Sequence, residues 1–194
     1  MAVAEPTLTL AADDFTLFGV PQRFAQDRLK LDARWKELQR EAHPDRFAAQ
    51  PAAAQRQALQ WSVRINEAYQ RLKDPLRRAA YLCELAGAPI NAHDNTAMPA
   101  AFLMQQMAWR EALEDARHAE QVQTLHDEVM QTRNDLLARC EELLDGANDP
   151  VQAVAQVRSL MFIDKFCADI DAHFETLQSH STPSVASRTT AGRD

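Results

Sequence analysis

Two stretches of this chain place apolar residues at helical spacing on either side of a short loop, and this pattern restricts the possible folds more than any other feature. In residues 28–42 the apolar positions recur at i, i+4, i+7 and i+11, which predicts a helix with one buried stripe. That stripe consists of Leu31, Trp35, Leu38 and Ala42. The second stripe, in residues 52–73, consists of Ala54, Ala58, Trp61, Ile65, Ala68 and Leu72. Because the loop between them is short, the helices are expected to pack antiparallel with the stripes facing each other.

Short helices are expected on both sides of this hairpin. Before it, an aspartate and Gly19 bound a helix predicted over residues 15–18, because aspartate caps helix starts and glycine closes helix ends. After it, Asp74 is followed by Pro75, a pair that opens helices. Residues 12–86 are therefore predicted to form one small helical domain.

The corner of the hairpin concentrates polar residues in a restricted geometry. Pro44 ends the first helix, because proline lacks an N–H group and forces the preceding residue out of the α region. His43 and Asp45 are thereby held close together, and Lys36 and Arg40 lie on the helix face that leads to them. A general base formed by His43 and Asp45 would need a nucleophile and a pocket, which an exposed tip is not expected to supply. For the tripeptide alone, an ordinary turn histidine is the alternative to a docking surface.

The second half of the chain is predicted to form a three-helix domain over residues 99–178. Residues 87–98, which contain glycine, proline, asparagine and aspartate, are the expected linker. The expected helices cover residues 99–119, 120–144 and 150–177. Short turns between long helices favour an antiparallel bundle. Residues 179–194 are poor in apolar side chains and are expected to be disordered.

Composition and charge exclude several classes of protein. Four glycines and many helix-forming residues favour an all-α fold, and no run approaches the roughly 18 apolar residues of a membrane span. The three cysteines are odd in number and far apart, and the N-terminus lacks the pattern of a signal peptide. We therefore expect a cytoplasmic protein that is not inserted in a membrane. Residues 12–86 hold 13 Lys and Arg against 10 Asp and Glu, whereas residues 87–178 hold 6 against 16. The acidic half argues against nucleic-acid binding, and opposite signs suggest two partners.

The first helix of the second domain has more apolar residues near its start than one face can bury. They are Met98, Phe102, Leu103, Met104, Met107, Ala108, Trp109 and Leu113. Each residue taken alone is best explained as core. The surplus, with Glu111, Glu114 and Asp115 following, predicts an exposed methionine-rich patch with an acidic rim. A patch of this kind is typical of a protein-binding surface.

The first half resembles the J-domain, the module that stimulates ATP hydrolysis by heat-shock chaperones. The resemblance covers the His-Pro-Asp tip, residues 65–72 (Ile-Asn-Glu-Ala-Tyr-Gln-Arg-Leu) and residues 74–81 (Asp-Pro-Leu-Arg-Arg-Ala-Ala-Tyr). It implies that the chaperone ATPase is contacted by His43, Pro44, Asp45, Lys36, Arg40 and Arg46. Arg46 stands where many members of the family have lysine, so the charge is kept although the two side chains differ in geometry.

The second half narrows the resemblance to the HscB-type co-chaperones of iron–sulfur cluster assembly. Residues 102–111 (Phe-Leu-Met-Gln-Gln-Met-Ala-Trp-Arg-Glu) and 158–165 (Arg-Ser-Leu-Met-Phe-Ile-Asp-Lys) carry this similarity. It implies an L-shaped protein that binds an HscA-type chaperone and an IscU-type cluster scaffold. The implied scaffold contacts are Leu103, Met104, Met107, Glu111, Asp115 and Phe162. Ala108 stands where relatives can have an acidic contact, and Asp115 replaces a glutamate. No cysteine precedes Cys83, which resembles the bacterial form and implies the bacterial cytoplasm.

Two alternatives follow from the same residues. A J-domain protein with a different client would use the patch to bind another protein. A helical metal or redox enzyme would need a Glu-x-x-His-type motif on each of two helices, and only Asp115-x-x-His118 occurs. Cys167 and His173 are six residues apart and are not expected to share a ligand face. We therefore expect no metal, no cofactor and no catalytic residue.

Overall fold

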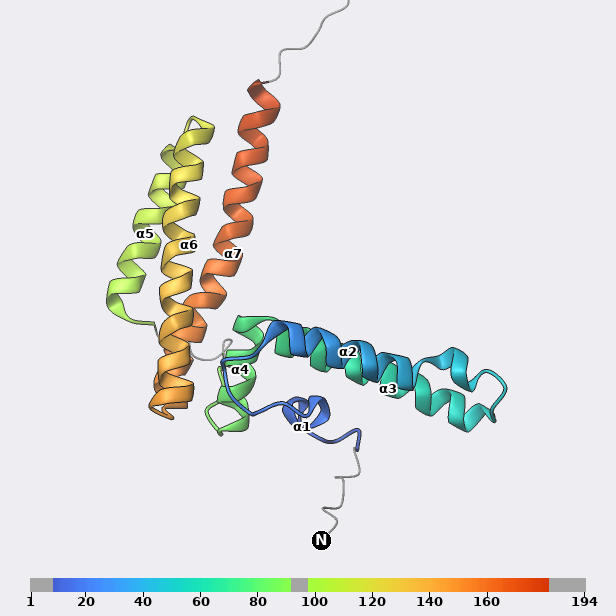
Figure 1. Cartoon of the computed structure of the whole chain (residues 1–194). Helices are drawn as coiled ribbons and strands as arrows, with labels where there is room; N and C mark the ends of the chain where they lie inside the picture. Colours follow the sequence, from blue (N-terminus) through green and yellow to red (C-terminus); the bar gives the residue numbers. More distant parts are fainter. Residues whose placement is uncertain (1–8, 92–97, 182–194) are drawn as a thin grey trace, which may run out of the picture.

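The computed structural model describes residues 9–91 and 98–181, and all regular elements within them are helical. In Figure 1 a hairpin of two helices extends sideways from the base of a three-helix bundle, so the molecule has the shape of an L. The all-α, L-shaped architecture expected from the sequence is confirmed. None of the described helices has the length and apolar character needed to cross a membrane.

The four helices of the first half begin and end near the capping residues and prolines that the sequence indicates. They are α1 (Asp14–Phe18), α2 (Arg28–Ala42), α3 (Ala52–Lys73) and α4 (Pro75–Leu85). The Asp27 carboxylate accepts from the Leu29 N–H at 2.9 Å to open α2, and Asp74 accepts from the Arg77 N–H at 2.9 Å to open α4. The predicted bounds of α2 and α3 are confirmed. The loop expected over residues 43–51 differs in part, because it contains a 3₁₀ turn, η1 (Pro44–Phe47).

Facing stripes hold the hairpin together as predicted, with polar bonds along one edge. Leu31, Leu38, Ile65, Ala68 and Leu72 are buried. Trp35 is only partly buried: its ring stacks on Tyr69 at 4.8 Å, and its Nε1 donates to Asn66 Oδ1 at 2.9 Å. Gln39 Nε2 donates to the same oxygen at 2.7 Å. These directional bonds fix the register of α2 against α3.

A buried ion pair ties α1 to α3. Asp14 is fully buried, and its carboxylate lies 2.7 Å from Arg64 Nη2 and 3.1 Å from Arg71 Nη1. Its backbone N–H donates to the Tyr81 hydroxyl at 3.1 Å, which adds a link to α4. A buried charge needs such partners, because leaving it unpaired in the interior is costly.

The bundle helices differ from their predicted bounds mainly at their C-terminal ends, and the starts of α5 and α6 differ by one residue each. The elements are α5 (Ala100–Asp115), α6 (Ala119–Glu141), the π-helical turn η2 (Glu142–Gly146) and α7 (Pro150–Ser181). α5 ends four residues before its predicted end at residue 119, because Ala116 is extended and buried where α6 turns back. The Gln121 side chain accepts from the His118 N–H at 3.1 Å and opens α6. Residues 179–181 are helical, so the predicted disordered tail does not begin at 179; residues 182–194 lie outside the described residues.

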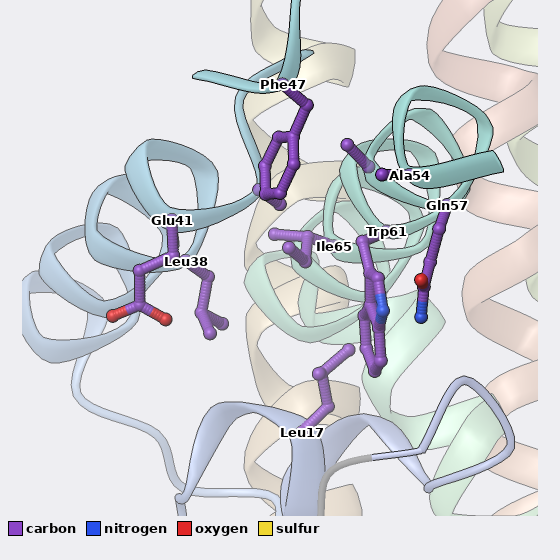
Figure 2. A pocket seen from close by; sticks show the side chains of 10 residues that line it. Leu17, Leu38, Glu41, Phe47, Ala54, Gln57, Trp61 and Ile65 are labelled. Atoms are coloured by element: carbon purple, nitrogen blue, oxygen red, sulfur yellow. The ribbon is translucent and has the colours of Figure 1, made fainter. Parts of the chain in front are cut away.

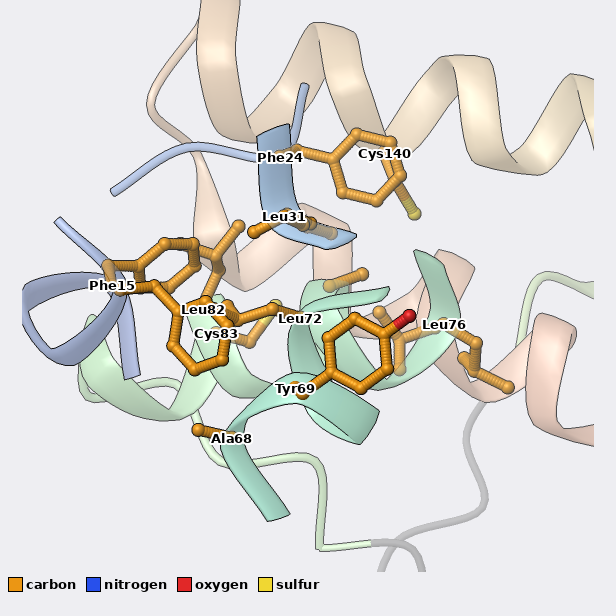
Figure 3. Packing of buried hydrophobic residues seen from close by; sticks show 14 of the residues in the cluster. Phe15, Phe24, Leu31, Ala68, Tyr69, Leu72, Leu76, Leu82, Cys83 and Cys140 are labelled. Carbon is orange, nitrogen blue, oxygen red and sulfur yellow. The ribbon is translucent and has the colours of Figure 1, made fainter. Parts of the chain in front are cut away.

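The apolar core does not divide where the sequence suggests a linker. One buried cluster joins Phe15, Phe24, Leu31 and other residues of the first half to Cys140 of α6 and to the start of α7 (Figure 3). A second cluster fills the upper bundle between α5, α6 and α7. Ile90 of the expected linker is buried in the first cluster, and residues 92–97 lie outside the described residues. The division into residues 12–86 and 99–178 therefore remains a prediction.

Candidate functional site

The His-Pro-Asp corner lies at the far end of the hairpin, where α2 ends. His43 closes α2 in an extended conformation, and Pro44, Asp45 and Arg46 form the 3₁₀ turn η1. The Asp45 N–H donates to His43 Nδ1 at 3.2 Å. A neutral imidazole that accepts at Nδ1 holds its proton on Nε2, so the ring presents an N–H donor to a partner. Both side chains are more than half exposed, so the corner is open to solvent.

A shallow groove beside this corner brings the predicted basic residues together. It is lined by Trp35, Lys36, Gln39, Arg40, His43 and Arg46. Arg46 Nη1 donates to the Arg40 carbonyl oxygen at 3.2 Å, which fixes the guanidinium of Arg46 over the end of α2. We call Lys36, Arg40, His43, Pro44, Asp45 and Arg46 the tip surface. Trp35, expected to face α3, also lines this groove, and sequence periodicity gave no signal for that role.

An apolar pocket of about 380 Å³ lies under the tip between α1, α2, α3 and η1. Figure 2 shows Phe47 of η1 pointing into it from one side, with Leu38, Trp61 and Ile65 around it. Neither His43 nor Asp45 lines this pocket, so it is not a substrate pocket for a general base at the tip. Its only charged lining residue is Glu41, so the pocket does not combine a nucleophile with a base.

The predicted apolar patch lies on the outer face of α5. Leu103, Met104 and Met107 have exposed fractions of 45%, 73% and 72%, and we call these three residues the bundle patch. Glu111 and Asp115 are exposed one and two turns further along the same helix. The structure thus places the apolar residues and their acidic rim on one continuous helix.

Phe162 of α7 differs from the other implied scaffold contacts because it is half-buried. Its ring meets the edge of Phe102 at 5.9 Å and stacks on Phe166 at 5.7 Å. The Arg110 guanidinium lies 5.5 Å from the ring centre. Phe162 therefore helps to hold α5 against α7.

Two polar residues to which sequence reasoning gave no role, Gln105 of α5 and Glu128 of α6, hold α5 in place. Trp109 is 1% exposed, and its Nε1 donates to Glu128 Oε1 of α6 at 2.8 Å. Gln105 Nε2 donates to the same oxygen at 2.8 Å. Glu128 looks like any exposed acidic residue of a helix in the sequence, so no local pattern indicates this contact. The bond also settles the place of Trp109, which is core.

The cysteines and acidic residues do not assemble a metal site in the described part of the chain. No group of three or more potential ligand side chains is close enough to hold an ion there. Burial raises the pKa of Cys83 to about 11 and that of Cys140 to about 12. Because the thiolate is the metal ligand and the nucleophile, these two buried thiols are inert at neutral pH.

Comparisons with known proteins identify the family to which the chain belongs. A family model described as the HSCB C-terminal oligomerisation domain matches residues 98–171. A co-chaperone protein HscB homolog from Bordetella avium is 47% identical over 165 residues, which are 84% of this chain and 98% of the relative. One from Burkholderia thailandensis is 47% identical over 174 residues, 88% of this chain and 99% of the relative.

Solved structures show the same fold. The chaperone HscB from Vibrio cholerae is 32% identical with a TM-score of 0.74, over 86% of this chain and 99% of that one. The crystal structure of human co-chaperone protein HscB has a TM-score of 0.79 at 24% identity, over 84% of this chain and 82% of that one, and shows the likeness of fold alone. With nearly the whole length of its bacterial relatives matched at almost half identity, this chain belongs to the HscB co-chaperone family.

Proposed function

We propose that this protein delivers an IscU-type iron–sulfur scaffold to an HscA-type heat-shock chaperone and stimulates ATP hydrolysis by that chaperone. The tip surface would contact the chaperone and the bundle patch would hold the scaffold. The protein itself would catalyse no reaction, and the bacterial cytoplasm is the proposed compartment. The observation that supports this most is that one molecule carries two separate exposed surfaces, a basic one at the hairpin tip and an apolar one on α5.

The chaperone half of the proposal rests on the tip surface. Lys36 and Arg40 are exposed on α2 and can steer an acidic partner surface toward the corner. His43 offers a donor at Nε2, and Pro44 holds it at a set position relative to the Asp45 carboxylate. A rigid corner loses little conformational entropy on docking. These properties suit the binding of a protein and require no chemistry on a substrate.

The scaffold half rests on the bundle patch and its rim. Flexible, polarisable methionine side chains adapt to a partner surface, and exposed apolar clusters of this kind mark interaction sites. Glu111 and Asp115 would add charge selection at the border of the patch. Binding scaffold and chaperone on one co-chaperone raises the effective concentration of each for the other, which would couple client delivery to ATP hydrolysis.

A titration of the scaffold protein tests the client half. Replacing Leu103, Met104 and Met107 together by alanine should weaken binding by about 2–5 kcal/mol, as expected for central apolar anchors. Phe162 is left unchanged, because its contacts with Phe102 and Phe166 also support the fold.

A matched control replaces two other exposed apolar residues, Leu29 (80% exposed) and Val151 (73% exposed), by alanine. This double variant should bind the scaffold as the wild type does. Equal affinity of the patch variant and the wild type would refute the scaffold assignment and favour a different client.

A further inference from the structure

The end of α6 is shaped to reach the first half of the chain. Instead of continuing as an α-helix to its end, α6 passes into the π-helical turn η2. Such turns are rare, and they are frequent at functional positions. The turn contains Asp145, whose two carboxylate oxygens accept from the backbone N–H groups of Phe24 at 2.6 Å and Ala25 at 2.8 Å. One side chain of the bundle thus caps a loop that lies about 120 residues earlier in the sequence.

The loop that Asp145 caps is held from its other side by a buried arginine. The Arg78 guanidinium of α4 lies 5.0 Å from the ring centre of Phe24 and donates to the Leu72 carbonyl oxygen at 2.5 Å. Arg78 is 8% exposed, and burial lowers its pKa while the negative charges of Asp74, Asp145 and Glu141 oppose that shift. Asp145 therefore also supplies part of the charge that a buried cation needs.

Close packing in the shared core and directional hydrogen bonds together fix the angle between the hairpin and the bundle. The shared core around Phe24 and Cys140 holds the two halves of the chain together by apolar burial (Figure 3). Hydrogen bonds are directional, and two of them from one carboxylate to consecutive amides define an orientation. A second directional link holds the segment that follows α4, because Arg158 of α7 donates through two nitrogens to the Ile90 carbonyl oxygen at 3.0 and 2.7 Å.

We propose that Asp145 is a positioning residue that sets the orientation of the hairpin relative to the bundle. By doing so it sets the placement of the tip surface relative to the bundle patch. Its consequence for activity rests on the proposed function, since only a protein that presents a client and triggers an ATPase at one place needs this angle to be fixed.

Amide hydrogen exchange and residual dipolar couplings test the orientation without any partner. In Asp145→Ala, the exchange rates of the Phe24 and Ala25 amides should rise by about 10- to 100-fold, as expected when a charge-assisted hydrogen bond is lost. Couplings from the hairpin and the bundle should fit one alignment tensor in the wild type and two in the variant. Unchanged exchange at both amides, or a single tensor in the variant, would overturn the proposal.

Two further variants keep this test interpretable. Glu142→Ala removes an acidic residue from the same turn that pairs with Arg139 of its own helix at 2.7 Å, so it should behave as the wild type. Asp145→Asn keeps one acceptor oxygen and should give an intermediate effect at the two amides. If Asp145→Ala fails to fold, the asparagine variant decides the question by the same measurements.

The functional consequence is measured as the amplification of chaperone ATPase stimulation by the scaffold. Asp145→Ala should bind the scaffold and stimulate the chaperone alone as the wild type does, but it should lose the amplification. Full amplification in a variant that needs two tensors would overturn the functional part. If the wild type shows no amplification, the proposed function has failed, and the exchange and coupling data still decide the role of Asp145.

Discussion

Replacing Trp109 by alanine should release α5 from the bundle while the rest of the protein stays folded. Trp109 of α5 contacts both neighbouring helices: it stacks on Phe166 of α7 at 6.0 Å and donates to Glu128 of α6 at 2.8 Å. Phe102 meets its edge at 6.0 Å within the same cluster. The hairpin and the base of α6 and α7 belong to the other core cluster, which contains no residue of α5.

The size of the effect follows from burial. Exchanging a buried aromatic side chain for alanine costs about 3–5 kcal/mol. Glu128 is exposed and can hydrate when its indole partner is removed, so no buried unpaired group adds to this figure. At 1.36 kcal/mol for each factor of ten, the opening equilibrium of α5 should rise by about 150- to 5,000-fold.

Hydrogen exchange followed by mass spectrometry separates local from global loss. Peptides from α5 should exchange faster in Trp109→Ala, while peptides from α2 and α3 keep their protection. Met107→Ala is the matched control on the same helix, because a 72% exposed side chain should change stability by about 0.5 kcal/mol or less. Retained protection of α5, or equal loss in all helices, would refute the view that Trp109 anchors this helix.

Two further predictions concern the first half of the chain. Asp14→Ala should lower the free energy of unfolding, measured by urea denaturation, by about 3 kcal/mol. This is the lower end of the range for breaking a buried ion pair, because both arginine partners are partly exposed and can hydrate. A loss below about 1 kcal/mol would contradict the role of this pair. The Tyr69 hydroxyl donates to Asp32 at 2.7 Å and lowers the pKa of that carboxyl. The bond to the ionised carboxylate therefore stabilises the fold above the unfolded pKa of about 4, and this stabilisation is lost as the pH falls through the folded pKa. Tyr69→Phe should therefore be less stable than the wild type near neutral pH and should converge with it in acid, whereas a difference that is constant with pH would contradict this reasoning.

Local signals were sufficient for the hairpin. Asp27 caps α2, Pro44 ends it and Asp74 separates α3 from α4, so the predicted bounds of α2 and α3 agree with the structure. The facing stripes also agree, since apolar periodicity reports directly on which face is buried. The resemblance to J-domain proteins rests on these same residues, which is why the first half was the easier to predict.

Tertiary contacts decided what local signals missed. Residues 115–120 contain no proline or glycine, and α5 ends there because α6 folds back and buries Ala116. The π-helical turn at 142–146 exists where Asp145 meets a loop far away in sequence, and no periodicity reports on such a contact. The burial of Trp109 depends likewise on Glu128 of another helix.

The same distinction between local signals and tertiary contacts applies to the site residues. An exposed apolar patch on α5 could be predicted, because a helix with too many apolar residues must leave some of them outside. That Leu103, Met104 and Met107 belong to it was implied by the family resemblance, and these three residues are exposed. The half-buried state of Phe162 could not, because it depends on how α7 packs against Phe102 of α5.

ATP hydrolysis by an HscA-type chaperone, measured with and without an IscU-type scaffold, tests the central claim most directly. The wild type should stimulate hydrolysis, and the scaffold should amplify that stimulation. His43→Gln should lose stimulation under both conditions, whereas the bundle-patch alanine variant should keep the basal stimulation and lose only the amplification. Stimulation by His43→Gln equal to that of the wild type, or no stimulation by the wild type at all, would contradict the account.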